Sequence, residues 1–187
     1  MDHSDSPERR YDAIAIMGVG LIGGSIAAAL KRRGLAETVI GIGRSESRLR
    51  AVADVGLIDT VSTSPAAVRD AELVIVCTPV DRIATDVLTA AAELRPGSEI
   101  TDAGSVKASI CREIESAGMP EGVRFIGSHP LAGSHESGWE HAEAELFEGR
   151  ICVITPITAG EEVDSVIPQF WQSLGMRAVV MLSLIHI

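Results

Sequence analysis

The stretch YDAIAIMGVGLIGGSIAAAL, residues 11–30, constrains the fold of this chain more than any other. It predicts a short apolar strand over Asp12–Met17, a glycine turn, and a helix that runs to about Arg33. The first glycine of GxGxxG permits a tight turn, the second lets a pyrophosphate approach, and the third lets the helix pack closely on the strand. Amide groups of the first helical turn then face an anion. This strand–turn–helix context predicts a dinucleotide site at Gly18, Gly20, Leu21, Ile22 and Gly23, rather than a merely structural turn.

The composition suits one α/β domain. The chain has 187 residues, of which 46% are hydrophobic and only 3% aromatic, so its core must be built from Ala, Val, Ile and Leu. Such a mixture is typical of buried parallel strands covered by helices. A net charge of −10 argues against nucleic acid or an anionic membrane surface as a partner.

No membrane or export segment is predicted. The uncharged run 13–30 approaches the length of a span, but glycines interrupt it and large aliphatic residues are few. The polar residues 1–10 lack the features of a signal peptide and are expected to form a disordered tail. Cys77, Cys111 and Cys152 are odd in number and lie in apolar context, which favours reduced core thiols in a cytoplasmic protein.

Strand and helix patterns alternate along residues 11–181. The later strands are expected at 38–42, 60–62, 71–77, 99–101, 123–127, 150–155 and 177–181, and the helices at 45–55, 78–94, 106–116, 139–146 and 163–174. The alternation predicts one dinucleotide-binding domain of Rossmann type: a doubly wound, mostly parallel sheet with helices on both faces. Ligands bind such sheets at the carboxyl ends of the strands, where Thr78-Pro79, 102–107 and 128–138 begin.

The end of the second predicted strand bears on the choice of cofactor. NAD sites usually carry an acidic residue about 20 residues after the glycine motif, but this chain has Gly43-Arg44-Ser45 there. Arg44 and Ser45 suit a 2′-phosphate, which favours NADP over NAD. The alternative interpretation is an NAD site, in which Arg44 is solvated and Glu46 or a backbone group forms the hydrogen bonds to the ribose.

Five segments together resemble the prephenate/arogenate dehydrogenase family. They are GVGLIGGS (18–25), VCTPV (76–80), TDAGSVK (101–107), GSHPLAGSHESG (127–138) and LFEGRICVITP (146–156). The resemblance extends over roughly 12–180. It implies oxidative decarboxylation of prephenate or arogenate in tyrosine biosynthesis, with a hydride passed to NAD or NADP.

The same resemblance implies roles for individual residues. His129 corresponds to the catalytic histidine of the family, and neutral histidine is a suitable base near pH 7. Ser105 corresponds to the serine that binds the substrate hydroxyl, although a simple helix N-cap is the alternative. Thr78 and Pro79 are expected beside the cofactor, and Lys107 is expected to be solvated or to face a phosphate, outside catalysis.

Residues after His129 depart from the family. Ser134 and His135 are candidates for the substrate site, and His135 stands where the family commonly has an acidic residue, which leaves the choice between prephenate and arogenate open. The spacing of His129, His135 and His141 does not place them on one helical face, and no thiolate lies nearby. No metal site is therefore predicted.

The family continues into a helical domain that supplies an arginine for the substrate carboxylates and most of a homodimer interface. That domain is not expected here, and residues 182–187, LSLIHI, are interpreted as a truncated or non-native end. The chain alone is therefore expected to show little turnover.

Two other functions stay open. A non-catalytic NAD(P)-binding or regulatory module would need neither Ser105 nor His129. A different Rossmann oxidoreductase, acting on a hydroxy acid or imine, would be expected to lack the TDxGSxK and HPxAG segments.

Overall fold

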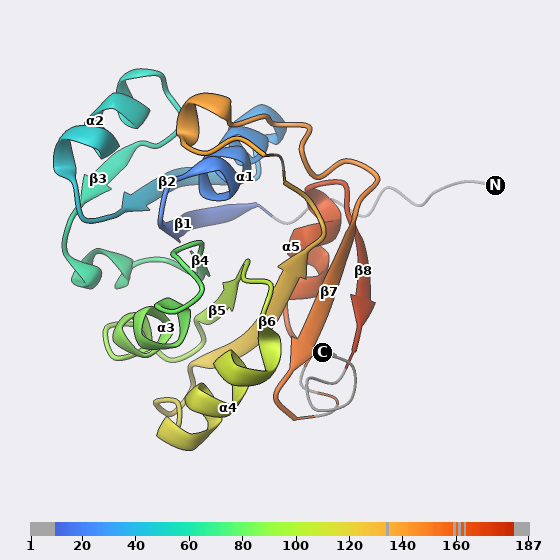
Figure 1. Cartoon of the computed structure of the whole chain (residues 1–187). Helices are drawn as coiled ribbons and strands as arrows, with labels where there is room; N and C mark the ends of the chain where they lie inside the picture. Colours follow the sequence, from blue (N-terminus) through green and yellow to red (C-terminus); the bar gives the residue numbers. More distant parts are fainter. Residues whose placement is uncertain (1–9, 134, 159, 161, 163, 182–187) are drawn as a thin grey trace.

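A single sheet runs through the centre of the molecule (Figure 1). The computed structural model describes residues 10–133, 135–158, 160, 162 and 164–181, so nearly all of the predicted tail and the whole predicted non-native end lie outside the described residues. Eight strands pair in the order β3-β2-β1-β4-β5-β6-β7-β8. They are β1 (Tyr11–Met17), β2 (Ala36–Ile42), β3 (Thr60–Ser62), β4 (Leu73–Val76), β5 (Glu99–Asp102), β6 (Arg124–Pro130), β7 (Ile151–Pro156) and β8 (Arg177–Val180).

Helices cover both faces of the sheet, which confirms the predicted fold class. They are α1 (Leu21–Arg33), α2 (Glu46–Asp54), α3 (Ile83–Ala91), α4 (Lys107–Ala117) and α5 (Ile167–Ser173), with short 3₁₀ turns η1 (Pro65–Val68) and η2 (Trp139–His141). No described helix has the length and apolar character that a membrane crossing requires.

Alternation along the central strands divides the core in two. Ile14 and Ile16 of β1 belong to the layer that includes residues of α1, α2 and α5, whereas Ala15 and Met17 belong to the layer that includes α3 and α4. Successive side chains of a strand point to opposite faces, so a strand buried on both sides needs an unbroken apolar run. The aliphatic run in β1 meets that need.

The strand that carries His129 is longer than its sequence pattern predicted. Strand β6 was expected to end at Gly127, but it continues to Pro130. Its first residues pair in parallel with β5, and its last five pair antiparallel with β7, where His129 lies opposite Val153. The partner strand β7 comes from over 20 residues later, so periodicity near His129 could not reveal the extension.

Two predicted helices at the carboxyl end of the sheet are wrong in their bounds, and the helix expected at 163–174 forms only over Ile167–Ser173. Thr78 and Pro79 do not begin α3: the Arg82 amide donates to the Pro79 carbonyl in a turn, and the helix begins at Ile83. Residues 139–146 form only η2 followed by turns, in which the Leu146 amide donates to the Glu143 carbonyl. Both segments cross the carboxyl end of the sheet, where contacts with other elements outweigh local helix propensity.

Candidate functional site

The glycine turn is held by contacts that only glycine allows. Gly18 has a φ of +91°, and a Cβ there would lie 2.8 Å from the carbonyl carbon and oxygen of Cys77. A Cβ on Gly23 would lie 2.3 Å from the Gly18 carbonyl oxygen. By contrast, a Cβ on Gly20 would meet nothing within 4 Å. The space over Gly20 at the start of α1 therefore fits the close approach of a pyrophosphate.

A cleft of about 670 Å³ opens over this turn, between the ends of β1, β2 and β4. Its walls include Gly18, Gly20, Arg44, Ser45 and Pro79, all predicted for the cofactor. Leu21, the first residue of α1, is not among the residues that line this cleft. The Ser45 hydroxyl accepts a hydrogen bond from the Arg48 amide at 3.4 Å, so this residue also caps α2.

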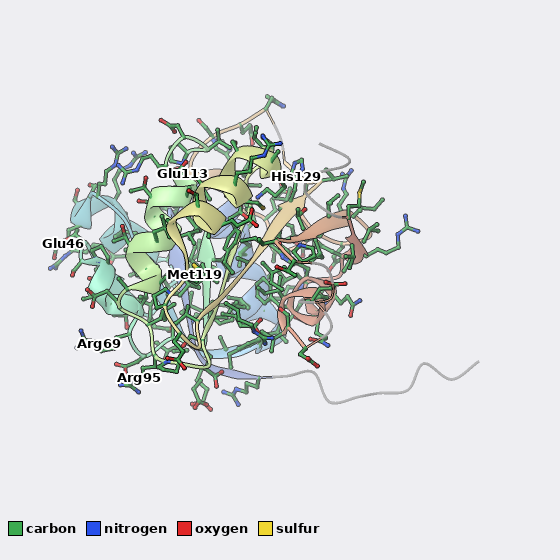
Figure 2. The ribbon with its side chains drawn as sticks, turned by 90° about the horizontal axis from the view of Figure 1, so that it is seen from below. Glu46, Arg69, Arg95, Glu113, Met119 and His129 are labelled. Carbon is green, nitrogen blue, oxygen red and sulfur yellow. The ribbon has the colours of Figure 1, made fainter. Side chains whose placement is uncertain are left out.

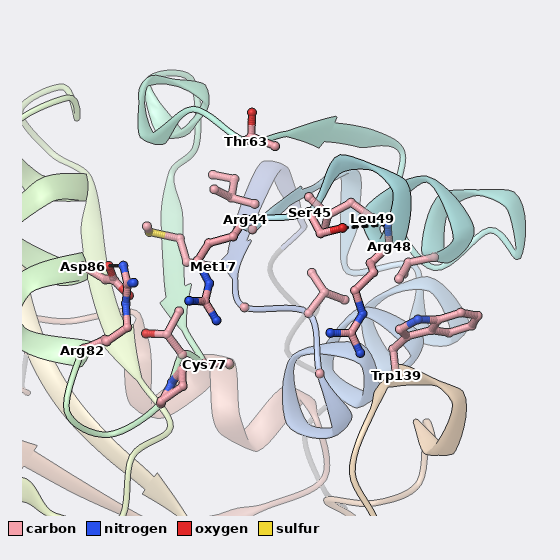
Figure 3. A pocket seen from close by; sticks show the side chains of 18 of the residues that line it. Met17, Arg44, Ser45, Arg48, Leu49, Thr63, Cys77, Arg82, Asp86 and Trp139 are labelled. Carbon is pink, nitrogen blue, oxygen red and sulfur yellow. Dashed lines mark hydrogen bonds and ion pairs between the residues drawn. The ribbon is translucent and has the colours of Figure 1, made fainter.

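Three arginines surround the cleft (Figure 3). Arg82 forms an ion pair with Asp86, at 3.0 Å. Among the described residues, neither Arg44 nor Arg48 forms an ion pair, and both are exposed. Two guanidinium groups without a carboxylate partner, in a chain of net charge −10, make this cleft suited to phosphate.

Sequence reasoning missed several residues of this cleft, among them Arg48 and Trp139. Arg48 lies in the first turn of α2, three residues after its cap Ser45, so helical spacing contained a signal for it. Trp139 reaches the cleft from the segment after β6, which packs on α1: a Cβ on Gly24 would lie 3.4 Å from the Trp139 Cβ. No local pattern links residue 139 to the glycine turn.

A second cleft, of about 310 Å³, brings Ser105 and His129 together with Thr78 and Ile22. It lies at the ends of β4, β5 and β6, and it shares Cys77 and Thr78 with the first cleft. The Thr78 hydroxyl is buried and has no hydrogen-bond partner among the described residues. His129 lies at the opposite end of the molecule from Arg69 and Arg95, as Figure 2 shows. Because they share Cys77 and Thr78, the two clefts are adjacent parts of one site at the carboxyl ends of the strands.

The environment of His129 favours the neutral imidazole. Partial burial lowers its pKa below the usual 6.5, the nearby Lys107 ammonium lowers the pKa further, and Asp102 opposes both effects. A neutral imidazole at the wall of a cleft can accept a proton from a bound hydroxyl group.

Lys107 differs from its prediction. It was expected to be solvated or to face a phosphate, but its side chain is fully buried and forms an ion pair with the equally buried Asp102. The TDxGSxK segment placed a polar cluster at this strand end, but the sequence alone did not reveal which members face inward.

The remaining candidates differ in their placement, and only Ser105 among them lines the second cleft. Ser105 is exposed, and α4 has Val106 at its N-cap with no side-chain bond, so Ser105 is not the cap of that helix. Ser134 lies outside the described residues. His135 is exposed and lines neither cleft, while the neighbouring Glu136 forms an ion pair with His141 at 2.9 Å. No cluster of three potential metal ligands occurs in the described part of the chain.

The fold and sequence match known proteins. Residues 26–180 match the model of the prephenate dehydrogenase nucleotide-binding domain. Prephenate dehydrogenase of Bacillus subtilis is 37% identical over 159 residues, which cover 82% of this chain and 41% of the relative. Cyclohexadienyl dehydrogenase of Zymomonas mobilis is 34% identical over 176 residues, which cover 91% of this chain and 58% of the relative.

Solved structures agree with this assignment. Prephenate dehydrogenase from A. aeolicus, in complex with hydroxyphenyl propionate and NAD+, superposes with a TM-score of 0.82 at 30% identity, covering 92% of this chain and 60% of that one. Synechocystis arogenate dehydrogenase gives a TM-score of 0.81 at 29% identity, covering 91% and 60%.

The chain spans 41% and 40% of the length of two of its curated relatives. The match to the family model extends over most of the sequence, and the chain therefore belongs to the prephenate dehydrogenase family, of which it represents the nucleotide-binding domain.

Proposed function

We propose that this chain is the cofactor-binding part of a prephenate or arogenate dehydrogenase and that it binds NADP+ in preference to NAD+. The observation that carries this proposal is the meeting of two clefts. One is built around the glycine turn, and the other presents His129 and Ser105. A regulatory module that only senses a nucleotide would not need a half-buried imidazole beside its cofactor cleft.

Residues of the chain have distinct tasks in this reaction. The substrate is a cyclohexadiene with a hydroxyl group at C4 and a carboxylate at C1. His129 takes the proton of the hydroxyl group, and Ser105 donates a hydrogen bond to the same oxygen. The nicotinamide, when bound, accepts the hydride from C4. Loss of CO2 from C1 then leaves an aromatic ring, which provides a strong thermodynamic driving force.

The preference for NADP+ rests on Arg44 and Arg48. Both lie where the 2′-substituent of the adenosine ribose is expected, near the end of β2. The alternative acceptor for an NAD ribose, Glu46, is exposed and bonded to Arg50 at 2.6 Å, and it does not line the cleft. Glu46 is therefore poorly placed to hold two ribose hydroxyl groups.

Calorimetric titration with each cofactor tests the proposal. We expect tighter binding of NADP+ than of NAD+, and we expect Arg44→Ala to weaken NADP+ binding about tenfold with little effect on NAD+. Equal binding of both cofactors by the unaltered chain would refute the preference. Binding of neither would refute the dinucleotide site itself.

The substrate side is tested by assays with prephenate and arogenate. We propose that Ser134 and His135 border the bound substrate and that the longer relatives supply further contacts and a homodimer interface. Slow oxidation of one substrate is therefore expected from this chain, and His129→Gln should lower that rate about 10²–10⁴-fold while cofactor binding persists. Unchanged oxidation in His129→Gln would remove His129 from the mechanism.

A further inference from the structure

A fully buried ion pair lies directly behind the second cleft. Asp102 is the last residue of β5 and Lys107 the first residue of α4, and neither side chain has any exposed surface. The chain has only two lysines, and the other, Lys31, pairs with Asp59 near the surface. The buried position of Lys107 therefore calls for a specific explanation.

Stability does not explain the pair. Removing two charges from water costs several kcal/mol per ion, and well-packed apolar residues often replace a buried pair without loss of stability. The position of Lys107 adds to the cost, because a cation at the start of a helix is disfavoured by the helix dipole. An uncharged pair would suit the core at least as well.

The contacts of Asp102 connect the pair to the reacting groups. One carboxylate oxygen, Oδ2, accepts hydrogen bonds from Lys107 and from the Gly104 amide, the latter at 2.9 Å. The other, Oδ1, accepts from the Ser128 amide at 3.1 Å. Gly104 precedes Ser105, and Ser128 precedes His129. One carboxylate therefore holds the backbone beside both candidate catalytic residues.

The Lys107 stem is confined against β6. A Cβ on Gly127 would lie 3.3 Å from the Lys107 Cδ and 3.5 Å from the Cys111 sulfur. Glycine at position 127 thus leaves room for the buried stem. The loop 103–106, which presents Ser105, is closed at its base by the ion pair between the residues that flank it.

We propose that Asp102 and Lys107 are positioning residues of the active site: Asp102 holds the backbone beside Ser105 and His129 in one arrangement, and the Lys107 ammonium neutralises that carboxylate from the base of the loop. The proposal rests on the proposed function only in naming Ser105 and His129 as the reacting groups. Neither member of the pair touches the substrate.

Two thiols of the described residues also lie near His129. Cys152 comes from β7 and Cys77 from the end of β4, and burial raises the pKa of both, so they remain uncharged at neutral pH. The charges that act on His129 are Lys107 from α4, which lowers the pKa of the imidazole, and Asp102 from β5, which raises it. Removing the lysine charge should therefore make the imidazole easier to protonate.

The test follows the imidazole directly by NMR pH titration of the chain labelled with ¹³C at histidine Cε1. His129→Gln identifies the His129 signal among the five histidines. We expect Lys107→Met to raise the pKa of His129, and Lys107→Arg, which retains the charge, to leave it near the wild-type value. Lys31→Met removes one lysine charge far from the site and should cause no shift.

The double variant Asp102→Asn/Lys107→Met separates positioning from folding. It places no unpaired charge in the core, and we expect it to fold and to bind cofactor within about threefold of the wild type. The Gly104 and Ser128 amides, which lose the Asp102 carboxylate as acceptor, should exchange hydrogen faster than in the wild type, while the amides of β1 do not. Loss of cofactor binding by the double variant would mean that the pair serves folding, which would overturn the proposal. An unshifted His129 pKa in Lys107→Met would overturn it as well. Failure of the wild-type chain to bind cofactor would instead contradict the proposed function.

Discussion

The two clefts of this molecule are built by different physical means. The larger one depends on a steric rule within a short stretch, because Gly18 and Gly23 approach the backbone so closely that a methyl group cannot fit. The smaller one depends on electrostatics between distant segments, because β5, α4 and β6 meet around the buried pair Asp102–Lys107. A binding surface for a common cofactor can thus be specified locally, whereas the arrangement of reacting groups needs the assembled sheet.

The difference predicts different failures. A disturbed glycine turn should damage both the fold and cofactor binding, since strand β1 and helix α1 meet there. A disturbed second cleft should leave the cofactor bound and change only the chemistry of His129. The following variants test that division.

Gly23→Ala should have the largest effect. The added Cβ would lie 2.3 Å from the Gly18 carbonyl oxygen, and backbone atoms cannot move aside as a flexible side chain can. We expect a loss of about 3 kcal/mol in the free energy of unfolding, measured in urea, and no detectable cofactor binding. A variant of wild-type stability would show that the turn is less tightly packed than the structure indicates.

Gly20→Ala is the matched control and should separate binding from stability. Its φ of −103° suits any residue, and a Cβ would meet no protein atom, so the free energy of unfolding should change by less than about 1 kcal/mol. The methyl group would occupy the space proposed for the pyrophosphate, and cofactor affinity should fall at least about tenfold. Calorimetry showing unchanged affinity would place the pyrophosphate elsewhere.

Arg48→Ala should weaken NADP+ binding about tenfold, since a charged hydrogen bond to phosphate contributes about 1.5–3 kcal/mol. Arg95→Ala is the control, because Arg95 precedes β5, at the end of the strands away from the cleft, and forms an exposed pair with Asp70. Removing Arg95 changes the net charge equally but should leave affinity unaltered. Equal losses in both variants would mean that the protein's overall charge, rather than a local contact, attracts the cofactor.

The smallest expected effect is on the pH dependence of stability. The pKa of His129 is lower in the folded chain than its usual 6.5, so the unfolded chain takes up the proton first as the pH falls. Protonation therefore favours unfolding, and the contribution of neutral His129 to stability is present above about pH 6.5 and is lost below it. Urea unfolding at about pH 7.5 and 5.5 should show a smaller pH-dependent loss in His129→Gln than in the wild type. An equal loss in both proteins would show that the folded environment does not disfavour the imidazolium.

Particular residues show how far sequence reasoning reached. The glycine turn, the central strand β1 and the full length of α1 were predicted correctly, because an apolar strand, a GxGxxG turn and a helix leave few alternatives over so short a distance. Thr78-Pro79 shows the opposite case. Its residue types are typical of a helix start, but the Thr78 hydroxyl is buried and the helix begins four residues after Pro79.

Residues distant in sequence account for the other misses. Trp139 reaches the cofactor cleft because the segment after β6 packs on α1, and His129 lies within a strand because β7 returns antiparallel to it. Neither contact can be predicted from the hydrophobic periodicity of the sequence near Trp139 or His129.

The sheet with its two apolar layers and the dinucleotide turn could be predicted from the sequence, because these depend on side-chain alternation and on the size of glycine. The sequence also placed Ser105 and His129 at strand ends. Only the tertiary structure decided that Lys107 is buried rather than solvated. The physical reason is that burial and charge pairing depend on which atoms surround a group, and the atoms around Lys107 come from β5 and β6 as well as from its own helix.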